Sequence, residues 1–360
     1  MRKKSGLLIL LLILIACLGG YVGLTNYNAL TEQQKTADAE AEKVYLSDLD
    51  KVVRISFQNS NGDFTFYLDG DQWYYSTDPE FPLKQSKLES IESTLKSLVA
   101  VRSFEPGDSL SAYGLDQPAY TLTAIDENGS SLTLRIGDSN GENYYAEKQD
   151  GTQIYTISNS LISSLNCSLN DLVELETFPT TGTDAITSLT ITAPDYALTL
   201  EKETVEAAPE TDAENAEDSV AASPASTADT TDVWYSVSPD GTRTALDTIS
   251  PASGDNPTDL MNQLLDAVTN LSFQSCVSYK ADNTQRTVYG MISPAMTLTV
   301  CYTQPDQDGS QTDKRYTLTI GTASGDGSSY YASMDASTAV NLLNAETVST
   351  LNQVLSAFRT

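Results

Sequence analysis

The chain has 360 residues, which suggests two or three domains. Its 20 Lys and Arg residues against 49 Asp and Glu residues give a formal net charge of −29, which argues against nucleic-acid binding because phosphate backbones are also anionic. Histidine is absent, so Ser-His-Asp and Cys-His catalysis and HExxH zinc sites are excluded. With 40% hydrophobic residues, the chain can still form cores.

The N-terminal segment predicts a membrane anchor. Arg2, Lys3 and Lys4 precede an apolar run from Gly6 to Leu24. As a helix, that run would span about 28 Å, close to a hydrocarbon core of roughly 30 Å. The preceding positive charge predicts a cytoplasmic N-terminus and an extracytoplasmic bulk. We therefore expect residues 1–28 to be a cytoplasmic tip and single-pass anchor in the cell membrane, with the lipid bilayer as partner.

A lipid anchor is the alternative. Leu14-Ile15-Ala16-Cys17 resembles a bacterial lipobox, in which the cysteine is lipidated and the preceding peptide is removed. The apolar pattern continues beyond Cys17 to Leu24, which favours an uncleaved helix. Both alternatives tether the protein to a membrane.

A helical stalk is predicted over residues 29–50. Thr31-Glu32-Gln33-Gln34 has the form of a capping box and opens an Ala-, Glu- and Lys-rich stretch that reaches about Tyr45. The globular part is then expected to begin near Val52.

Four motifs occur twice, in the same order. The first half contains Trp73-Tyr74-Tyr75, Tyr113-Gly114-Leu115-Asp116-Gln117-Pro118, Leu132-Thr133-Leu134-Arg135-Ile136-Gly137 and Tyr144-Tyr145-Ala146. The second half contains Trp234-Tyr235-Ser236, Tyr289-Gly290-Met291-Ile292-Ser293-Pro294, Tyr316-Thr317-Leu318-Thr319-Ile320-Gly321 and Tyr330-Tyr331-Ala332. Four ordered matches predict a duplicated domain.

An acidic segment interrupts the second copy. In the first copy, the strand before Trp73 reaches it through an Asp69-Gly70 hairpin turn. In the second, the strand Ala197-Leu198-Thr199-Leu200 should pair with the Trp234 strand, and the segment lies between them. We expect a first repeat over residues 51–180 and a second over 184–360, with a boundary near Pro179–Asp184 and a disordered acidic insertion over 201–232.

The hydrophobic pattern within each copy predicts mixed secondary structure. Val53, Ile55 and Phe57 alternate as in a half-buried strand, and Ser86 is placed to cap a helix. The element order predicts an α+β fold of two tandem repeats, each a mainly antiparallel sheet with packed helices, behind the N-terminal transmembrane helix.

The Tyr113–Pro118 segment, with the tryptophan hairpin before it and the Ile-Gly and Tyr-Tyr strands after it, resembles a bacterial envelope protein family known as domain of unknown function 4340. The resemblance covers roughly Val52 to Asn352 as two copies, and the second departs at Met291-Ile292-Ser293 and by its insertion. It implies a membrane-anchored envelope protein, similar to accessory components encoded beside ABC-type transport systems linked to gliding motility. It implies no catalytic residues.

The repeated motifs define a candidate interaction surface, made of Trp73, Tyr75, Tyr113, Gly114, Pro118, Trp234, Tyr289, Gly290 and Pro294. These residue types also suit a structural role, with glycine at a positive φ and aromatic rings in the core. No catalytic, cofactor-binding or metal residue is predicted.

Two weaker sequence patterns concern the acidic turns and the cysteines. The acidic turns Asp138–Glu142 and Asp306–Gly309 could bind Ca²⁺, although neither completes an EF-hand loop and both suit hairpin turns. The widely spaced Cys167, Cys276 and Cys301 are expected to be isolated thiols, with one disulfide pair left open.

Three functions follow as hypotheses. The first is a non-enzymatic accessory or interaction protein of an ABC-type membrane transport system, with transporter subunits or other envelope proteins as partners. The alternative is a module that binds cell-wall polysaccharide or another envelope ligand through its Trp and Tyr strands. A third, an envelope hydrolase, would need two carboxylates about 5–10 Å apart in a cleft.

Overall fold

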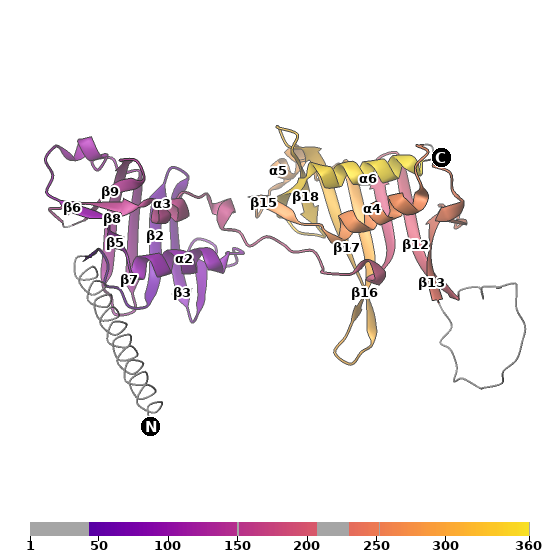
Figure 1. The fold of residues 1–360 in the computed structure, drawn as a ribbon, viewed down its shortest axis with the longest axis horizontal. Coiled ribbons are helices and arrows are strands. Elements are labelled where there is room, and N and C mark those ends of the chain that lie inside the picture. Colours follow the sequence, from indigo (N-terminus) through magenta and orange to yellow (C-terminus); the bar gives the residue numbers. More distant parts are fainter. Residues whose placement is uncertain (1–42, 150, 207–229, 252, 360) are drawn as a thin grey trace, which may run out of the picture. The chain divides into compact units, whose positions relative to one another are not determined.

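The computed structural model describes residues 43–149, 151–206, 230–251 and 253–359 (Figure 1). The predicted membrane anchor, Cys17 and most of the predicted stalk lie outside these ranges. No described helix is long and apolar enough to cross a membrane. The chain forms two compact units that divide between Ser168 and Leu169.

The first unit is built on an antiparallel sheet that has eight strands among the described residues. Their order across the sheet is β4-β3-β2-β7-β8-β9-β10-β6. The strands are β2 (Val52–Asn59), β3 (Gly62–Asp69), β4 (Gln72–Tyr75), β6 (Arg102–Phe104), β7 (Tyr120–Asp126), β8 (Ser131–Ser139), β9 (Asn143–Lys148) and β10 (Ile154–Ser158). The helices α2 (Gln85–Lys96) and α3 (Asn159–Leu165) pack on one of its faces (Figure 1).

The second unit repeats this sheet with one more strand, in the order β14-β13-β12-β11-β16-β17-β18-β19-β15. The strands are β11 (Ile186–Ala193), β12 (Tyr196–Glu206), β13 (Thr230–Val237), β14 (Arg243–Ala245), β15 (Phe273–Ser278), β16 (Met296–Pro305), β17 (Gln311–Ala323), β18 (Ser329–Met334) and β19 (Val340–Asn344). The helices α4 (Pro257–Thr269) and α6 (Ala345–Ala357) contact each other and cover one face of this sheet (Figure 1).

Each core follows from strict alternation along the strands. In β8, Leu134 and Ile136 are fully buried under the helices, whereas Arg135 between them lies on the other face. In α2, Leu88, Ile91 and Leu95 are buried, because their spacing places them on one side of a helix.

Strand register confirms the duplication residue by residue. Phe57 pairs with both Phe64 and Leu122, and the corresponding Ile191 pairs with Leu198 and Leu298. Likewise, Ile136 lies opposite Ala146, and Ile320 lies opposite Ala332. The motif alignment read from the sequence is therefore also an alignment in space. It confirms two tandem, sheet-rich α+β repeats.

The predicted stalk is wrong at its C-terminal end. Strand β1 (Val44–Tyr45) pairs with β5 (Val99–Ala100), and Leu46 is buried. The Ser47 hydroxyl donates a hydrogen bond to the Leu95 carbonyl at the end of α2. Tertiary pairing overrides the helical composition here, so the first unit begins before Val52.

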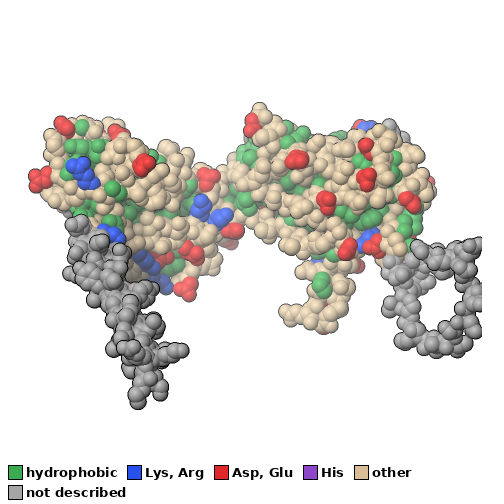
Figure 2. All heavy atoms as spheres, viewed as in Figure 1, with side chains coloured by type: hydrophobic (Ala, Val, Ile, Leu, Met, Phe, Trp, Pro, Cys, Tyr) green, Lys and Arg blue, Asp and Glu red, His purple; other side chains and the backbone are tan. Residues whose placement is uncertain are grey.

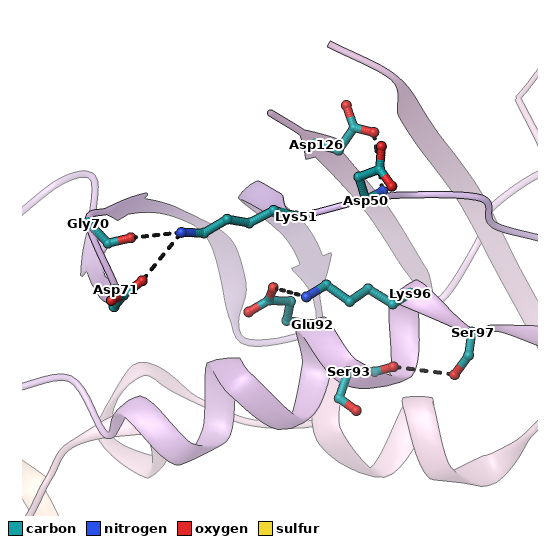
Figure 3. A network of polar contacts seen from close by, with 9 residues as sticks. All are labelled: Asp50, Lys51, Gly70, Asp71, Glu92, Ser93, Lys96, Ser97 and Asp126. Atoms are coloured by element: carbon teal, nitrogen blue, oxygen red, sulfur yellow. Dashed lines mark hydrogen bonds and ion pairs between the residues drawn. The ribbon is translucent and has the colours of Figure 1, made fainter. Parts of the chain in front are cut away.

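Polar contacts hold this first stretch against the sheet (Figure 3). The Asp50 amide donates to the Asp126 carboxylate at 3.3 Å. The Lys51 ammonium lies 3.3 Å from Asp71 and donates to the Gly70 carbonyl at 3.2 Å, in the turn between β3 and β4. The turn predicted at Asp69-Gly70 thus also anchors the preceding chain.

Other boundaries also differ from prediction. Helix α2 begins after Lys84 without a side-chain cap, so Ser86 is not its cap. Strands β12 and β13 pair as predicted, but their pairing extends from Thr199–Val237 to Glu206–Thr230, so the predicted insertion over 201–232 is too wide. The division at Ser168 lies before the boundary expected near Pro179–Asp184, because Leu169–Leu172 contacts β15.

Candidate interaction site

The Tyr-Gly segment of the first unit crosses the sheet face opposite the helices. The short 3₁₀ helix η1 (Leu110–Tyr113) ends at Gly114, whose φ of 69° is the left-handed conformation that favours glycine. The segment passes directly over Gly137 of β8, where an added Cβ would lie 2.2 Å from the Tyr113 carbonyl oxygen. Two repeated motifs therefore meet at a backbone-to-backbone contact, which we call the Tyr-Gly crossover.

The second unit makes the same crossover. Helix α5 (Asn283–Val288) leads to Gly290, with a φ of 77°. A Cβ on Gly321 of β17 would lie 1.9 Å from the Tyr289 carbonyl oxygen, which accepts a hydrogen bond from the Thr322 amide at 3.0 Å. In both units the crossed strand shifts register just after its glycine, as at a β-bulge.

The Tyr-Tyr-Ala motif meets the Tyr-Gly and Ile-Gly motifs at this point. The ring of Tyr113 lies 5.1 Å from that of Tyr145, edge to face, and Tyr289 lies 4.5 Å from Tyr331. The Tyr113 hydroxyl accepts a hydrogen bond from the Gly107 amide at 3.2 Å. The tyrosines and glycines of the motifs thus form a structural junction in each unit.

The side chains that pack against the crossover differ between the two units. In the first unit, Arg135 and Glu147 form an ion pair of 2.7 Å, and Arg135 also donates to the Leu115 carbonyl. In the second, Met291 packs with Ala281 and Val340 in a small apolar cluster. Leu115 and Met291, which occupy the same motif position, are both buried.

The outer surface of the second crossover is apolar. Val288 is 68% exposed and Ile292 is 58% exposed, on either side of Tyr289-Gly290. The first unit carries Ala112 and Asp116 at these two motif positions, both exposed. The second crossover therefore presents two apolar side chains where the first presents a methyl group and a carboxylate.

Two of the five aromatic residues of the predicted surface are buried, and the other three, Tyr113, Trp234 and Tyr289, are half-buried. Trp73 is 1% exposed and Tyr75 is 8% exposed, so both belong to the core of the first unit. Trp234 is half-buried and packs against the core of the second unit. Pro118 and Pro294 are half-buried beside their crossovers. Of the nine candidate residues, Trp73 and Tyr75 thus have little ring surface to offer a partner.

The predicted acidic turn Asp306–Gly309 satisfies its own backbone. The Ser310 amide and hydroxyl donate to Asp308, and these hydrogen bonds hold the pKa of Asp308 below its usual value. In a further turn, between β17 and β18, Ser324 and Ser328 donate to Asp326, whose pKa falls to about 2. Within the described ranges, no group of three or more His, Cys, Asp or Glu residues is placed to hold a metal ion.

One cysteine lies beside the second crossover, where the Cys276 thiol donates to the Val340 carbonyl at 4.0 Å. None of Cys167, Cys276 and Cys301 forms a disulfide. Burial, together with the nearby Glu176 carboxylate, raises the pKa of the Cys276 thiol to about 11, which keeps it protonated at neutral pH.

Two contacts that support the site escaped sequence reasoning. The Arg135–Glu147 pair joins adjacent strands, and its only signal was a charged residue at a polar position in each of two neighbouring strand patterns. The Gln85 side chain accepts from the Trp73 amide at 2.8 Å and donates to the Trp73 carbonyl at 3.0 Å. No sequence pattern predicts that contact, because it depends on how α2 packs against β4.

Comparison with known proteins identifies a family. A family model described as Domain of unknown function (DUF4340) matches residues 73–233 and 256–360, consistent with two tandem copies. Neither a curated protein nor a solved structure matches the chain. With most of its length matched, in two segments that carry the crossovers described above, the chain belongs to the DUF4340 family.

Proposed function

We propose that this protein is a membrane-anchored, extracytoplasmic, non-enzymatic accessory protein that acts through surface contacts with subunits of an ABC-type membrane transport system. The observation that carries the proposal is the exposed apolar pair Val288 and Ile292 at the second crossover. Adjacent apolar side chains exposed on a surface are typical of protein contact sites. On the face shown in Figure 2, acidic side chains are scattered over both units.

The apolar pair is held on a rigid base, which favours recognition. The Asp282 side chain caps α5 in a reciprocal capping box with Gln285. The Arg286 guanidinium donates to the Ser337 carbonyl at 3.1 Å, which ties the helix to the chain after β18. A partner would therefore meet an ordered surface and lose little entropy on binding.

The test is affinity purification of the full chain from gently solubilised membranes. The wild type should recover transporter subunits, and the double variant Val288→Ala, Ile292→Asp, which installs the first unit's residues, should lose them. A matched control, Val101→Ala with Leu110→Ala, removes exposed apolar groups from the first unit and should retain them. Empty recovery with the wild type, together with empty crosslinking, would count against the proposal.

Polysaccharide binding is the second candidate, and one observation favours it. Tyr67 and Tyr74 stack at 5.6 Å on the sheet face opposite the helices of the first unit, where both are half-buried. Trp73 is not available for stacking because it is buried. Sedimentation with purified wall material should fall in Tyr67→Ala and Tyr74→Ala variants if this pair binds sugar, and should be unaffected if it does not.

A further inference from the structure

The second unit contains a cavity of about 470 Å³ at the end of its sheet where β12 begins and β13 ends. Its lining includes Tyr196, Leu198, Ser236, Pro239, Ile249 and Phe358. The volume falls within the roughly 300–1,000 Å³ of ordinary ligand pockets. The cavity lies away from the Tyr-Gly crossover and uses none of its residues.

The repeat shows what occupies this place in the other unit. Ser236 is the third residue of the Trp-Tyr-Ser motif and corresponds to Tyr75 in Trp-Tyr-Tyr. Register gives the same match, because Tyr75 lies opposite Phe66 and Ser236 lies opposite the corresponding Leu200. The two side chains therefore start from equivalent backbone positions.

An aromatic cluster fills the position in the first unit. The Tyr75 ring lies 5.5 Å from Phe66 and 5.6 Å from Phe81. Tyr75 is 8% exposed and Phe81 is 5% exposed, so little of either ring reaches solvent. Serine lacks the aromatic ring at this position, which leaves space along the second unit's wall.

Hydrogen bonds and an ion pair hold the lining of the cavity in place before any ligand binds. The Tyr196 hydroxyl donates to the Phe358 carbonyl at 2.8 Å, and Arg359 lies 2.6 Å from Asp195. Together they join the turn between β11 and β12 to the end of α6. On the other side, the Ser238 amide donates to the Thr242 carbonyl at 2.9 Å and closes the turn after β13. A cavity with fixed walls costs little to occupy.

The lining suits a ring that carries one polar group. Leu198, Ile249 and Pro239 supply apolar surface, while Ser236 and Thr244 supply hydroxyl groups. We propose that this cavity binds an aromatic side chain of the tyrosine type, presented by a partner polypeptide, in the space that Tyr75 fills in the first unit. That the ring comes from a partner polypeptide rests on the proposed function, whereas the cavity and its preference for an aromatic ring do not.

The test titrates the full chain with N-acetyl-tyrosine amide and follows methyl NMR signals. Leu198 and Ile249 should shift saturably, whereas Ile55 and Leu122 in the first unit's core should stay in place. Ser236→Tyr, which restores the first unit's residue, should weaken binding at least tenfold. Thr190→Tyr, which adds the same ring to the opposite sheet face, should bind as the wild type does.

Three outcomes would overturn the inference. They are the absence of a saturable shift, equal binding by Ser236→Tyr, and equal binding of N-acetyl-leucine amide, which would show a cavity without aromatic preference. If Ser236→Tyr does not fold, Ser236→Leu gives the same test with a smaller group. If the titration fails but transporter subunits are recovered, only the inference about the cavity is overturned. If the titration succeeds but no transporter subunit is recovered, only the proposed function is overturned.

Discussion

Beneath the Tyr-Gly crossover, the first unit places the ion pair of Arg135 and Glu147, and the second places Thr319 and Ser333 at the same register positions. Ser333 turns its hydroxyl to the Ser337 carbonyl instead of to its strand neighbour. The crossover itself is unchanged. The close backbone approach at the glycines therefore defines this junction, and side chains below it can exchange charge for hydroxyl groups.

The sheet edges differ in a similar way. In the second unit, β14 pairs with the outer side of β13 through Tyr235–Ala245 and Val237–Arg243. In the first, the Gln85 amide bonds both the amide and the carbonyl of Trp73 on β4. One side chain thus bonds the outer edge of β4 at Trp73, whereas in the second unit a strand covers the outer edge of β13 over the next three motif positions. Each unit also contains one of the chain's two tryptophans, so each can be followed separately by fluorescence.

Breaking the shared feature should have the largest effect. Gly321→Ala forces a Cβ to within 1.9 Å of the Tyr289 carbonyl oxygen, so the second unit should lose about 3 kcal/mol of stability or more. Urea unfolding in a Trp73→Phe background reads the second unit through Trp234. Gly325→Ala is the control, because nothing lies within 4 Å of its added Cβ. Equal stability of the two variants would contradict the close approach.

Exchanging the supporting side chains should have a smaller effect. Arg135→Thr or Glu147→Ser alone leaves a largely buried charge without its partner and should cost about 1–2 kcal/mol, since the arginine side chain is 33% exposed. The double variant installs the second unit's pair and should cost less than the sum of the two. A double-mutant cycle of unfolding free energies measures this coupling, and strict additivity would show that the pair contributes nothing.

Removing the Gln85 contact tests the difference between the sheet edges of the two units. Gln85→Ala leaves the Trp73 amide and carbonyl without their side-chain partner, and we expect a loss of about 1–2 kcal/mol in the first unit. The exposed edge should also raise aggregation, as seen by light scattering. Gln117→Ala, at an exposed position, should change neither. An unaltered first unit in the Gln85 variant would mean that solvent replaces the amide at no cost.

The smallest effect should depend on pH. Burial alone would raise the pKa of Asp126, but hydrogen bonds from the Ser130, Asp50 and Asn128 amides outweigh it and lower that pKa (Figure 3). A lowered pKa stabilises the fold above the unfolded-state value of about 4 and loses that contribution as pH falls further.

The contribution of Asp126 should be confined to the first unit. The second unit carries the buried Tyr302 at the corresponding register position. The urea midpoint read by Trp73 in a Trp234→Phe background should therefore drop between about pH 5 and about pH 2, measured at steps of about one pH unit. Asp126→Asn should flatten that drop, and a drop of equal size in both proteins would assign the acid sensitivity elsewhere.

Local rules predicted the elements whose partners are close in sequence. The Asp69-Gly70 turn gives Gly70 a φ of 64°, and it closes the hairpin between β3 and β4 as expected. The repeated glycines at Gly114 and Gly290 have the positive φ that their residue type suggested. Such features depend on a few neighbouring residues, which is why a single sequence reveals them.

Long-range contacts decided the places where sequence reasoning failed. Val44 and Tyr45 follow a helical composition but pair with Val99–Ala100, far along the chain. The edge strands β6 and β15 were missed because β6 has only three residues and two register shifts interrupt the alternation of β15. For the site, the sequence identified the tyrosines and glycines but not that they meet, since the crossover joins motifs that lie more than twenty positions apart.

The long pairing of β12 with β13 has a practical consequence. It holds Glu206 opposite Thr230, and paired residues of adjacent antiparallel strands have Cα atoms only about 5 Å apart. Whatever connects these two positions begins and ends at nearly the same point, so its length places little demand on the sheet. A fluorescent protein or an epitope tag spliced between them should leave the second unit's fold intact, giving a natural attachment point for tracking the molecule in cells.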